Sequence, residues 1–302
     1  MRKWLGCGGR RRGPLLLVGR GRRRIQGVLT GGAGMTGCAT RPGVGLRRCP
    51  PDGGSVVLAS SRLGLDGHPE QRPLAERVGS VARYLPGVSP FGAFAEPPGP
   101  DDWRAMERLV GPGAVAIVPG HTGHPPDGWA LEYDGQGIQL TAAHLLAGTA
   151  DVAANRPDID VVPLGAAEAD EMVALVQLTR PGPFSPRTFE LGGYVGVRHE
   201  GVLVAMAGQR FRPEGWCEIS AVATHPDHRR QGLGEHVVRM VAAGIAARGE
   251  TAFLHTAADN TNAIRLYEAM GFTLRRRVRF VAARAPGDAT GIPPPTLPPA
   301  RG

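Results

Sequence analysis

Residues 229–234 read Arg-Arg-Gln-Gly-Leu-Gly and stand between two contrasting segments. An apolar run at 219–224 precedes them and stops at Pro226, and a long amphipathic segment begins at Leu233. A strand that leads through a glycine-bearing loop into a helix presents unpaired backbone N–H groups at the positive end of the helix dipole. A bound pyrophosphate needs such donors, so the stretch predicts a site for a phosphorylated cofactor.

Two other glycine motifs fit this stretch poorly. The dinucleotide-binding motif G-x-G-x-x-G requires a glycine three positions after Gly234, where Val237 stands. The phosphate-binding loop of nucleotide triphosphatases requires a lysine after its last glycine, and none follows here. Both kinds of nucleotide site are therefore disfavoured.

Periodic patterns of apolar residues continue on both sides of the glycine loop. Strands are expected at 160–164, 194–198, 202–207, 218–224, 252–256 and 272–281, and helices at 166–179, 233–247 and 262–270. Glu200-Gly201 supplies a hairpin turn between the second and third strands. The order β-α-β-β-β-α-β-α-β predicts an α/β fold, an α+β mixed sheet with helices on its faces.

A second motif follows the first by about thirty residues, at Asn260-Thr261-Asn262-Ala263-Ile264-Arg265-Leu266-Tyr267-Glu268-Ala269-Met270-Gly271-Phe272. With both motifs in this order, residues 160–283 resemble the GNAT superfamily of acyl-CoA-dependent N-acyltransferases. The signatures of that superfamily are Arg/Gln-x-x-Gly-x-Gly/Ala and Asn-x-x-Ala-x-x-Leu-Tyr-x-x-x-Gly-Phe. The resemblance implies a GNAT fold in the C-terminal half, N-acetyltransferase activity and acetyl-CoA as co-substrate.

The resemblance also implies which residues hold the cofactor. The end of the strand before the loop would bind the pantetheine arm like an added strand, and the loop would hold the pyrophosphate through its N–H groups. Asn260 would bond the CoA arm, although a residue in front of a helix can serve only as a cap. The implied cofactor-binding residues are Val222, Ala223, Thr224, Arg229, Arg230, Gln231, Gly232, Leu233, Gly234, Glu235 and Asn260.

Tyr267 matches the family tyrosine that lies near the CoA sulfur and acts as a general acid. Its structural alternative is a tyrosine that only packs in the core. The oxyanion of the reaction is expected to meet a backbone N–H of the strand that carries Val222.

Two residues are candidates for the general base. Glu218 occupies the place of the base in a histone-acetylating branch of the superfamily, and the alternation of a strand puts it on one face with Val222. Its alternative role is a rim carboxylate paired with Arg210 or Arg212. His255 matches a base glutamate in the ribosomal-protein-acetylating branch, and histidine is a common base near neutral pH.

The acceptor is expected to be a small-molecule amine. An α/β unit in front of the acyltransferase unit is similar to glycine N-acyltransferase-like proteins, in which the first unit is a degenerate GNAT-like relative of the second. This resemblance implies a small amine or amino acid, with protein N-termini or lysines as competing acceptors. Carboxylates near the expected acceptor side favour a cationic amine: Glu168, Asp170, Glu171 and Glu190. A different class of function, an acyl-CoA-binding sensor module without turnover, also fits the motifs.

Composition divides the chain into four parts. Residues 1–72 form a disordered basic leader, for which a later start such as Met35 is an alternative. Residues 73–156 form a smaller N-terminal α/β unit, with helices at 74–78 and 103–110 and strands at 114–118 and 137–140. The GNAT acetyltransferase domain spans 157–284, and 285–302 form a disordered proline-rich tail.

The charge and cysteine patterns restrict the partners. The first fifty residues hold twelve of the 35 basic residues and no acidic one, which leaves 23 basic against 27 acidic residues in the body. Nucleic-acid binding is therefore expected at most through the leader. Cys217 stands alone in the body, no His/Cys cluster suggests a metal, and the apolar patch at 15–18 is too short to span a bilayer. We expect a cytoplasmic monomer or homodimer with no metal, nucleic acid or membrane as partner.

Overall fold

The computed structural model describes residues 68–94, 97–121, 123–142 and 159–288. The chain divides into two compact units, residues 1–49 and 50–302, and all of the described residues belong to the second. Most of the expected leader, most of the expected tail and the expected boundary between 156 and 157 lie outside the described residues.

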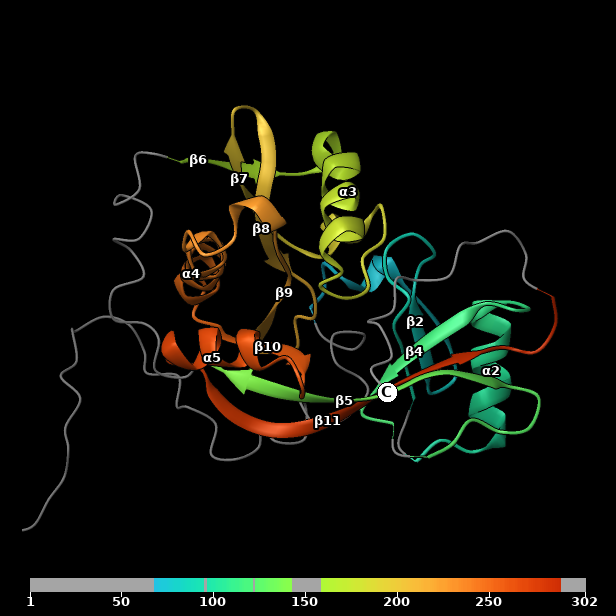
Figure 1. Cartoon of the computed structure of the whole chain (residues 1–302). Helices are drawn as coiled ribbons and strands as arrows, with labels where there is room; N and C mark the ends of the chain where they lie inside the picture. Colours follow the sequence, from blue (N-terminus) through green and yellow to red (C-terminus); the bar gives the residue numbers. More distant parts are fainter. Residues whose placement is uncertain (1–67, 95–96, 122, 143–158, 289–302) are drawn as a thin grey trace, which may run out of the picture. The chain divides into compact units, whose positions relative to one another are not determined.

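An eight-stranded mixed sheet runs through the described residues in the order β4-β11-β5-β10-β9-β8-β7-β6 (Figure 1). Only β9 and β10 pair in parallel, and every other pair of neighbours is antiparallel. The strands are β4 (Val115–Pro119), β5 (Ala130–Thr141), β6 (Asp160–Leu164), β7 (Tyr194–His199), β8 (Val202–Gln209), β9 (Trp216–Thr224), β10 (Thr251–Ala257) and β11 (Thr273–Arg284).

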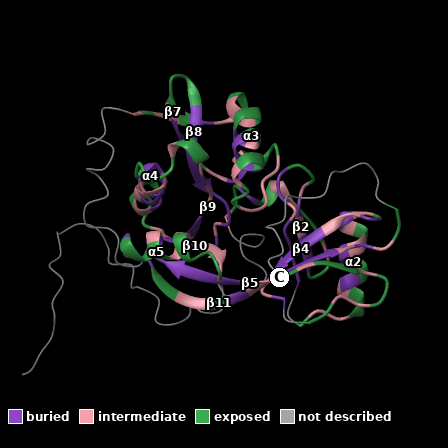
Figure 2. Cartoon of the chain, in the orientation of Figure 1, coloured by how far each residue is buried: buried purple, intermediate pink, exposed green. Residues whose placement is uncertain are grey.

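Helices α3 (Ala169–Thr179) and α4 (Leu233–Ala247) cover opposite faces of this sheet. The side chains of β8 show which helix each face meets, although a bulge at Val204, which has no partner on β7, interrupts their alternation. Leu203 and Met206 pack in one cluster with α3, whereas Val204 and Ala205 pack in another with α4. Figure 2 shows that β8, which lies between the two helices with β9, is buried along most of its length, whereas β9 is partly buried.

From residue 160 onward the elements follow the predicted order. Each predicted strand and helix is present, with ends that shift by a few residues, and the short helix α5 (Thr261–Ala269) covers the second motif. Glu200 and Gly201 both have positive φ, at 51° and 81°, as a two-residue hairpin turn requires. The predicted fold class, a mixed α+β sheet of the GNAT type, is confirmed.

The N-terminal elements differ in part from the prediction. Helix α2 (Pro100–Val110) agrees with the predicted helix at 103–110, but the predicted helix at 74–78 is wrong, because η1 (Arg72–Leu74) leads into strand β1 (Ala75–Val78). Strand β1 pairs with β2 (Val81–Tyr84), which pairs with β3 (Gly92–Ala93) in a separate three-stranded sheet. Five residues are too few for a stable helix, and Gly79 at φ 59° allows a tight turn into β2.

Strand β5 joins the two halves of the described chain. It comes from the predicted N-terminal unit, yet it lies between β10 and β11 and pairs with both. The predicted strand at 137–140 is only the buried end of this twelve-residue strand. The sheet that carries the two sequence motifs therefore includes a strand from before residue 142.

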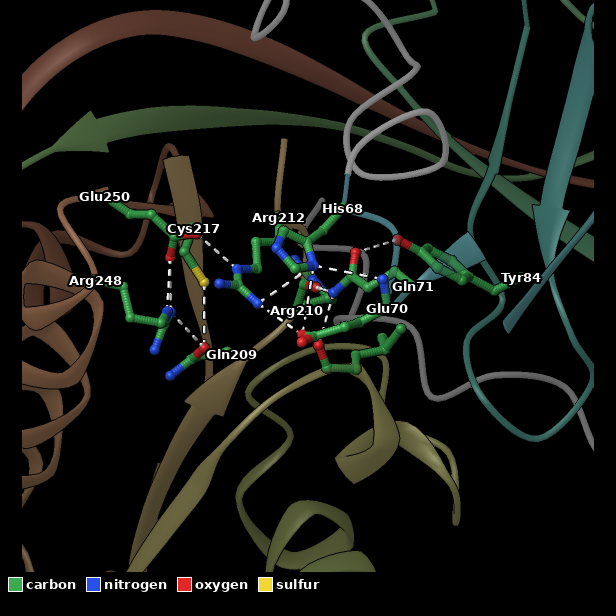
Figure 3. Close-up of polar contacts among 11 residues, drawn as sticks. His68, Glu70, Gln71, Tyr84, Gln209, Arg210, Arg212, Cys217, Arg248 and Glu250 are labelled. Atoms are coloured by element: carbon green, nitrogen blue, oxygen red, sulfur yellow. Dashed lines mark hydrogen bonds and ion pairs between the residues drawn. The ribbon is translucent and has the colours of Figure 1, made fainter. Parts of the chain in front are cut away.

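A polar cluster ties residues 68–71 to the hairpin between β8 and β9 (Figure 3). Gln71 is buried, and its amide donates to the carbonyl oxygens of Leu191 and Arg210 at 2.7 and 2.5 Å. Arg212 forms ion pairs with Glu70 and Glu250 at 2.9 and 2.7 Å. The predicted disordered leader, residues 1–72, includes residues 68–72, which the structure describes. For these five residues the prediction of disorder is wrong, because the hydrogen bonds of Gln71 hold them in place.

Candidate active site

The parallel strands β9 and β10 separate toward their C-terminal ends. Their pairing runs from Trp216 with Thr251 to Ile219 with Leu254, although both strands continue for several residues. On its other edge β9 carries a bulge, since two residues, Ala221 and Val222, stand opposite a single residue of β8. Ala221 has a φ of 52°, in the left-handed region that residues with a Cβ rarely adopt. Beyond Ile219 the separation therefore leaves the backbone of β9 without paired residues on β10.

The glycine loop follows the end of β9 directly. The short helix η5 (Pro226–His228) leads to Arg230 and Gly232, which have φ values of 64° and 77°, and α4 begins at Leu233. A Cβ added at Gly234 would lie 3.4 Å from Oγ1 of Thr224, so a glycine lets the loop pack closely on the strand end. The N-terminus of α4 and its N–H groups thus lie beside the separated strands.

A single cavity of about 1050 Å³ joins these parts. Seven of the eleven residues predicted to bind the cofactor line it: Val222, Ala223, Thr224, Arg229, Arg230, Gly234 and Asn260. The other four do not line it, because Leu233 is buried in the core, Glu235 pairs with Arg239, and Gln231 and Gly232 lie exposed at the turn. The lining also includes Phe91, Ile117, Tyr133, Phe280 and the segment 179–183.

Tyr267 lines the cavity from α5 and is only 6% exposed. Its ring meets that of Phe272 edge-on, with centroids 5.8 Å apart. Burial raises the pKa of Tyr267 to about 12, because an ionised phenol would lose its hydration. The hydroxyl therefore carries its proton at neutral pH and is available as a donor inside the cavity.

Glu218 is fully buried on β9 and does not line the cavity. Its two carboxylate oxygens accept hydrogen bonds from Nε and Nη2 of Arg210 at 2.7 and 2.8 Å. Burial alone would raise the pKa of Glu218, but the charge of Arg210 and hydrogen bonds from Arg210 and His255 outweigh it and lower the pKa to about 2. The predicted alternative, an ion pair of Glu218 with Arg210, is present. The predicted position of Glu218 on the rim of the site is wrong, because the side chain is buried. Arg212, the other arginine considered, pairs with Glu250.

His255 lies on β10 between Glu218 and the cavity, which it lines. Its Nδ1 lies 2.7 Å from a carboxylate oxygen of Glu218, and its Nε2 lies 3.0 Å from the amide nitrogen of Gln139. The carbonyl oxygen of Gln139 accepts a hydrogen bond from Arg275 at 2.7 Å. A continuous polar chain thus runs from Arg210 through Glu218, His255 and Gln139 to Arg275.

These partners fix which nitrogen of His255 carries the proton. An ionised Glu218 can only accept, so Nδ1 of His255 donates to it. Arg275 can only donate, so the carbonyl oxygen of Gln139 faces Arg275 and its NH₂ group faces His255. Nε2 of His255 therefore accepts from Gln139. The imidazole is neutral in this arrangement and its free electron pair is already engaged.

Asn260 caps helix α5, because its side-chain oxygen accepts a hydrogen bond from the backbone N–H of Ala263 at 3.2 Å. The side chain is exposed and also lines the cavity. Asn260 therefore serves as a helix cap in this structure. Its side-chain NH₂ group has no hydrogen-bond partner among the described residues and could bind a ligand.

The sequence analysis missed Gln139 and Arg275. Neither belongs to a motif, and Gln139 is a fully buried polar residue in the predicted strand at 137–140. A buried glutamine in an apolar strand must find hydrogen-bond partners, and that requirement is the one signal the sequence offered.

Within the described residues, no group of three or more His, Cys, Asp or Glu side chains is arranged to hold a metal ion. The helices of the same part of the chain are too short or too polar to cross a bilayer.

The chain is similar to a known protein family and to several solved structures. The model of the FR47-like protein family matches residues 194–281. A GNAT-family protein from Novosphingobium aromaticivorans, named as an acetyltransferase, is 33% identical; the alignment covers 77% of this chain and 99% of that chain, with a TM-score of 0.64. A GCN5-related N-acetyltransferase from Kribbella flavida is 21% identical over 71% of this chain and 90% of that chain, with a TM-score of 0.50, and shares the fold. No match was found among curated proteins.

Proposed function

Because this chain belongs to the GNAT family of acetyltransferases, we propose that it transfers an acetyl group from acetyl-CoA to a primary amine of a small molecule. One observation supports this function above the others. A single cavity joins the glycine loop, the separated strands, Tyr267 and His255. A thioester held along β9 would have both an acid and a candidate base within the same space.

The residues of the cofactor half suit a CoA molecule. The N–H groups at the start of α4 and the side chains of Arg229 and Arg230 would hold the pyrophosphate. The separated end of β9, around Val222, would pair with the pantetheine arm as an added strand. Bound there, acetyl-CoA would supply an activated acyl carbon as a thioester.

His255 is the better placed of the two candidate bases. Glu218 is shielded from the cavity, and with a pKa of about 2 it is a weak proton acceptor at neutral pH. His255 lines the cavity, and the carboxylate at its Nδ1 would stabilise the imidazolium that forms when it takes the proton of the amine. Glu218 would then act as a positioning residue for His255.

Proton uptake by His255 requires Gln139 to move. Once Nε2 of His255 carries a proton, the NH₂ group of Gln139 can no longer donate to it. Rotation of the amide by half a turn would present its oxygen to His255 and release Arg275. Tyr267 would give its proton to the leaving thiolate, and a backbone N–H beside Val222 would stabilise the oxyanion.

The sensor alternative has one observation in its favour. Both candidate bases have their proton-accepting atoms engaged by other side chains, Glu218 by Arg210 and His255 by Gln139. If the side-chain amide of Gln139 could not rotate, the protein would bind acyl-CoA without turnover.

Tyr267→Phe tests the proposed function. The protein is incubated with acetyl-CoA and a panel of primary amines while free thiol is followed with a thiol-reactive dye. Loss of the hydroxyl is expected to lower the rate of thiol release by about 100-fold or more, because a general acid contributes that much. The affinity for CoA, measured by calorimetry, should stay the same because the ring remains.

Tyr194→Phe is the matched control. Tyr194 is also buried, lies outside the cavity, and its hydroxyl has no partner among the described residues, so its loss should leave thiol release unchanged. Full activity in Tyr267→Phe would contradict its role as the acid. Tight CoA binding without thiol release over the whole panel would favour the sensor instead.

A further inference from the structure

The described chain has four residues other than glycine with positive φ: Arg180, Glu200, Ala221 and Arg230. Glu200 belongs to the tight hairpin turn between β7 and β8. The other three line the cavity. Backbone strain of this kind persists where the surrounding structure imposes it, and it gathers at sites that bind ligands.

Ala221 and Arg230 lie in the half of the cavity that would hold CoA, one in the bulge of β9 and the other in the glycine loop. Arg180 has no place in that half. It caps the C-terminus of α3, with φ 48° and ψ 55°, and it precedes Pro181. A glycine would suit the left-handed cap, and a following proline disfavours helical backbone further. What an arginine adds at this position is its guanidinium group.

The guanidinium of Arg180 is exposed and has no partner among the described residues. Of the other three cavity arginines, Arg210 is bonded to Glu218 and Arg229 to the carbonyl oxygen of Thr224, whereas Arg230 shares with Arg180 the lack of a partner among the described residues. Two carboxylates of the cavity wall are paired with other arginines, Glu132 with Arg284 and Asp134 with Arg279, and the third, Asp259, forms no ion pair with Arg180.

Arg180 and Arg230 line one cavity from two different helix ends. Arg230 precedes α4 and Arg180 ends α3, and these helices pack on opposite faces of the sheet. If Arg230 binds the phosphates of CoA, then the guanidinium of Arg180 remains available to the acceptor, which would enter from the face of the sheet that α3 covers. The lining of the same cavity also includes the apolar side chains of Phe91, Ile117 and Phe280.

We propose that Arg180 binds the carboxylate of the acceptor, and that the acceptor is an amino acid with an apolar side chain. The inference rests on the proposed acetyl transfer. The guanidinium would hold the carboxylate by charge-assisted hydrogen bonds, the apolar wall would cover the side chain, and the amine would be left free to face His255.

The test compares each amino acid with its decarboxylated amine, for example L-phenylalanine with phenethylamine and L-leucine with isopentylamine. With the native protein, the KM for the amino acid is expected to be about 10- to 100-fold lower than that for its amine, as for one hydrogen-bonded ion pair. Equal KM values within each pair would overturn the proposal while leaving acetyl transfer intact, and so would acetylation of peptide N-termini in preference to free amino acids.

Arg180→Gly removes the guanidinium and at the same time relieves the backbone. It should raise the KM for amino acids about 10- to 100-fold, leave the KM for amines unchanged, and not lower the unfolding temperature. Arg180→Lys should recover part of the loss because it keeps the charge. Glu200→Gly is the matched control, since it relieves the same strain outside the cavity and should leave both KM values unchanged.

A binding measurement separates this proposal from the proposed function. Calorimetry with L-phenylalanine is made on protein saturated with free CoA, which needs no turnover. Binding to the native protein that is lost in Arg180→Gly supports the carboxylate site even if no acceptor is acetylated. Equal binding by the two proteins, or binding by neither, overturns it.

Discussion

Glu218 remains ionised in a fully buried position where an isolated carboxylate would be protonated. Two hydrogen bonds from Arg210 and one from His255 compensate for the lost hydration. Arg210 in turn lies over the rings of Phe91 and Phe211, 4.5 and 4.7 Å from their centroids. The ion pair of Glu218 with Arg210 therefore holds His255 in position through its Nδ1 atom, and Arg210 packs this ion pair against Phe91 and Phe211.

The lowered pKa of Glu218 predicts a loss of stability in acid. A carboxylate whose pKa falls from the ordinary 4.5 to about 2 on folding stabilises the native state above pH 4.5. This stabilisation, about 3 kcal/mol, should be lost as the pH falls from about 5 toward 2. Urea unfolding at a series of pH values measures it.

Glu218→Gln should remove this part of the pH dependence and cost about 3–5 kcal/mol near neutral pH, because Arg210 is left buried without its anion. Glu171→Gln is the control, since Glu171 pairs with Arg198 at an exposed site and should cost less than about 1 kcal/mol. An acid unfolding curve of Glu218→Gln that matches the native protein would count against the ion pair.

At this scale the sequence predicted the residues that belong to local motifs. Tyr267 and the loop residues Arg229, Arg230 and Gly234 all line the cavity, as the spacing of the two motifs indicated. Gln139 could not be assigned, because its partners His255 and Arg275 are 116 and 136 positions away. Contacts over such separations leave no periodic pattern in a single sequence.

Among the elements, those with long and regular patterns were predicted well and those shaped by tertiary contacts were not. Helix α4 begins and ends as its apolar spacing indicated. The bulge at Ala221 was not predicted, because nothing in the chemistry of alanine marks a left-handed residue. The spacing of Leu74 and Val78 predicts a helix at 74–78, but the pairing of β1 with β2 overrides this short local pattern.

The start of α4 carries the clearest prediction for an element. Gly232→Asp should weaken CoA binding by about 100-fold or more, because it sets a negative charge where the phosphates would lie. Gly249→Asp is a close control: Gly249 follows the other end of the same helix with a φ of 74°, against 77° for Gly232. Calorimetry should show near-native affinity for Gly249→Asp, and a similar loss in both variants would place the phosphates elsewhere.

Across the whole molecule, the position of β5 decides which segments can fold alone. β10 and β11 do not touch each other as sheet neighbours, because β5 lies between them. The sequence indicated a strand at 137–140 but not its partners, since the pairing of β5 with β11 joins positions from 132 residues apart, Thr141 with Thr273, to 154 residues apart, Ala130 with Arg284. The predicted division into units 73–156 and 157–284 remains a prediction, and the shared sheet crosses it.

Removal of β5 gives a prediction at this scale. A chain of residues 157–302 lacks the strand between β10 and β11, and it leaves Phe253 without the core partners Ile117 and Phe91. It should therefore show no cooperative thermal transition by circular dichroism, whereas residues 50–302, the second compact unit, should unfold in one step. A shorter chain that melts cooperatively and binds CoA like the longer one would show that β5 is dispensable.

The central strand also affects how the protein is made. During synthesis β5 leaves the ribosome before either of its neighbours has been translated, and β11, its longest partner, comes near the end of the described chain. Until β10 and β11 have been made, its buried end, Ile138 to Thr141, lacks both of its neighbouring strands. A nascent chain with such an unpaired strand is a natural client for chaperones, so the yield of active protein should depend on translation speed and chaperone supply.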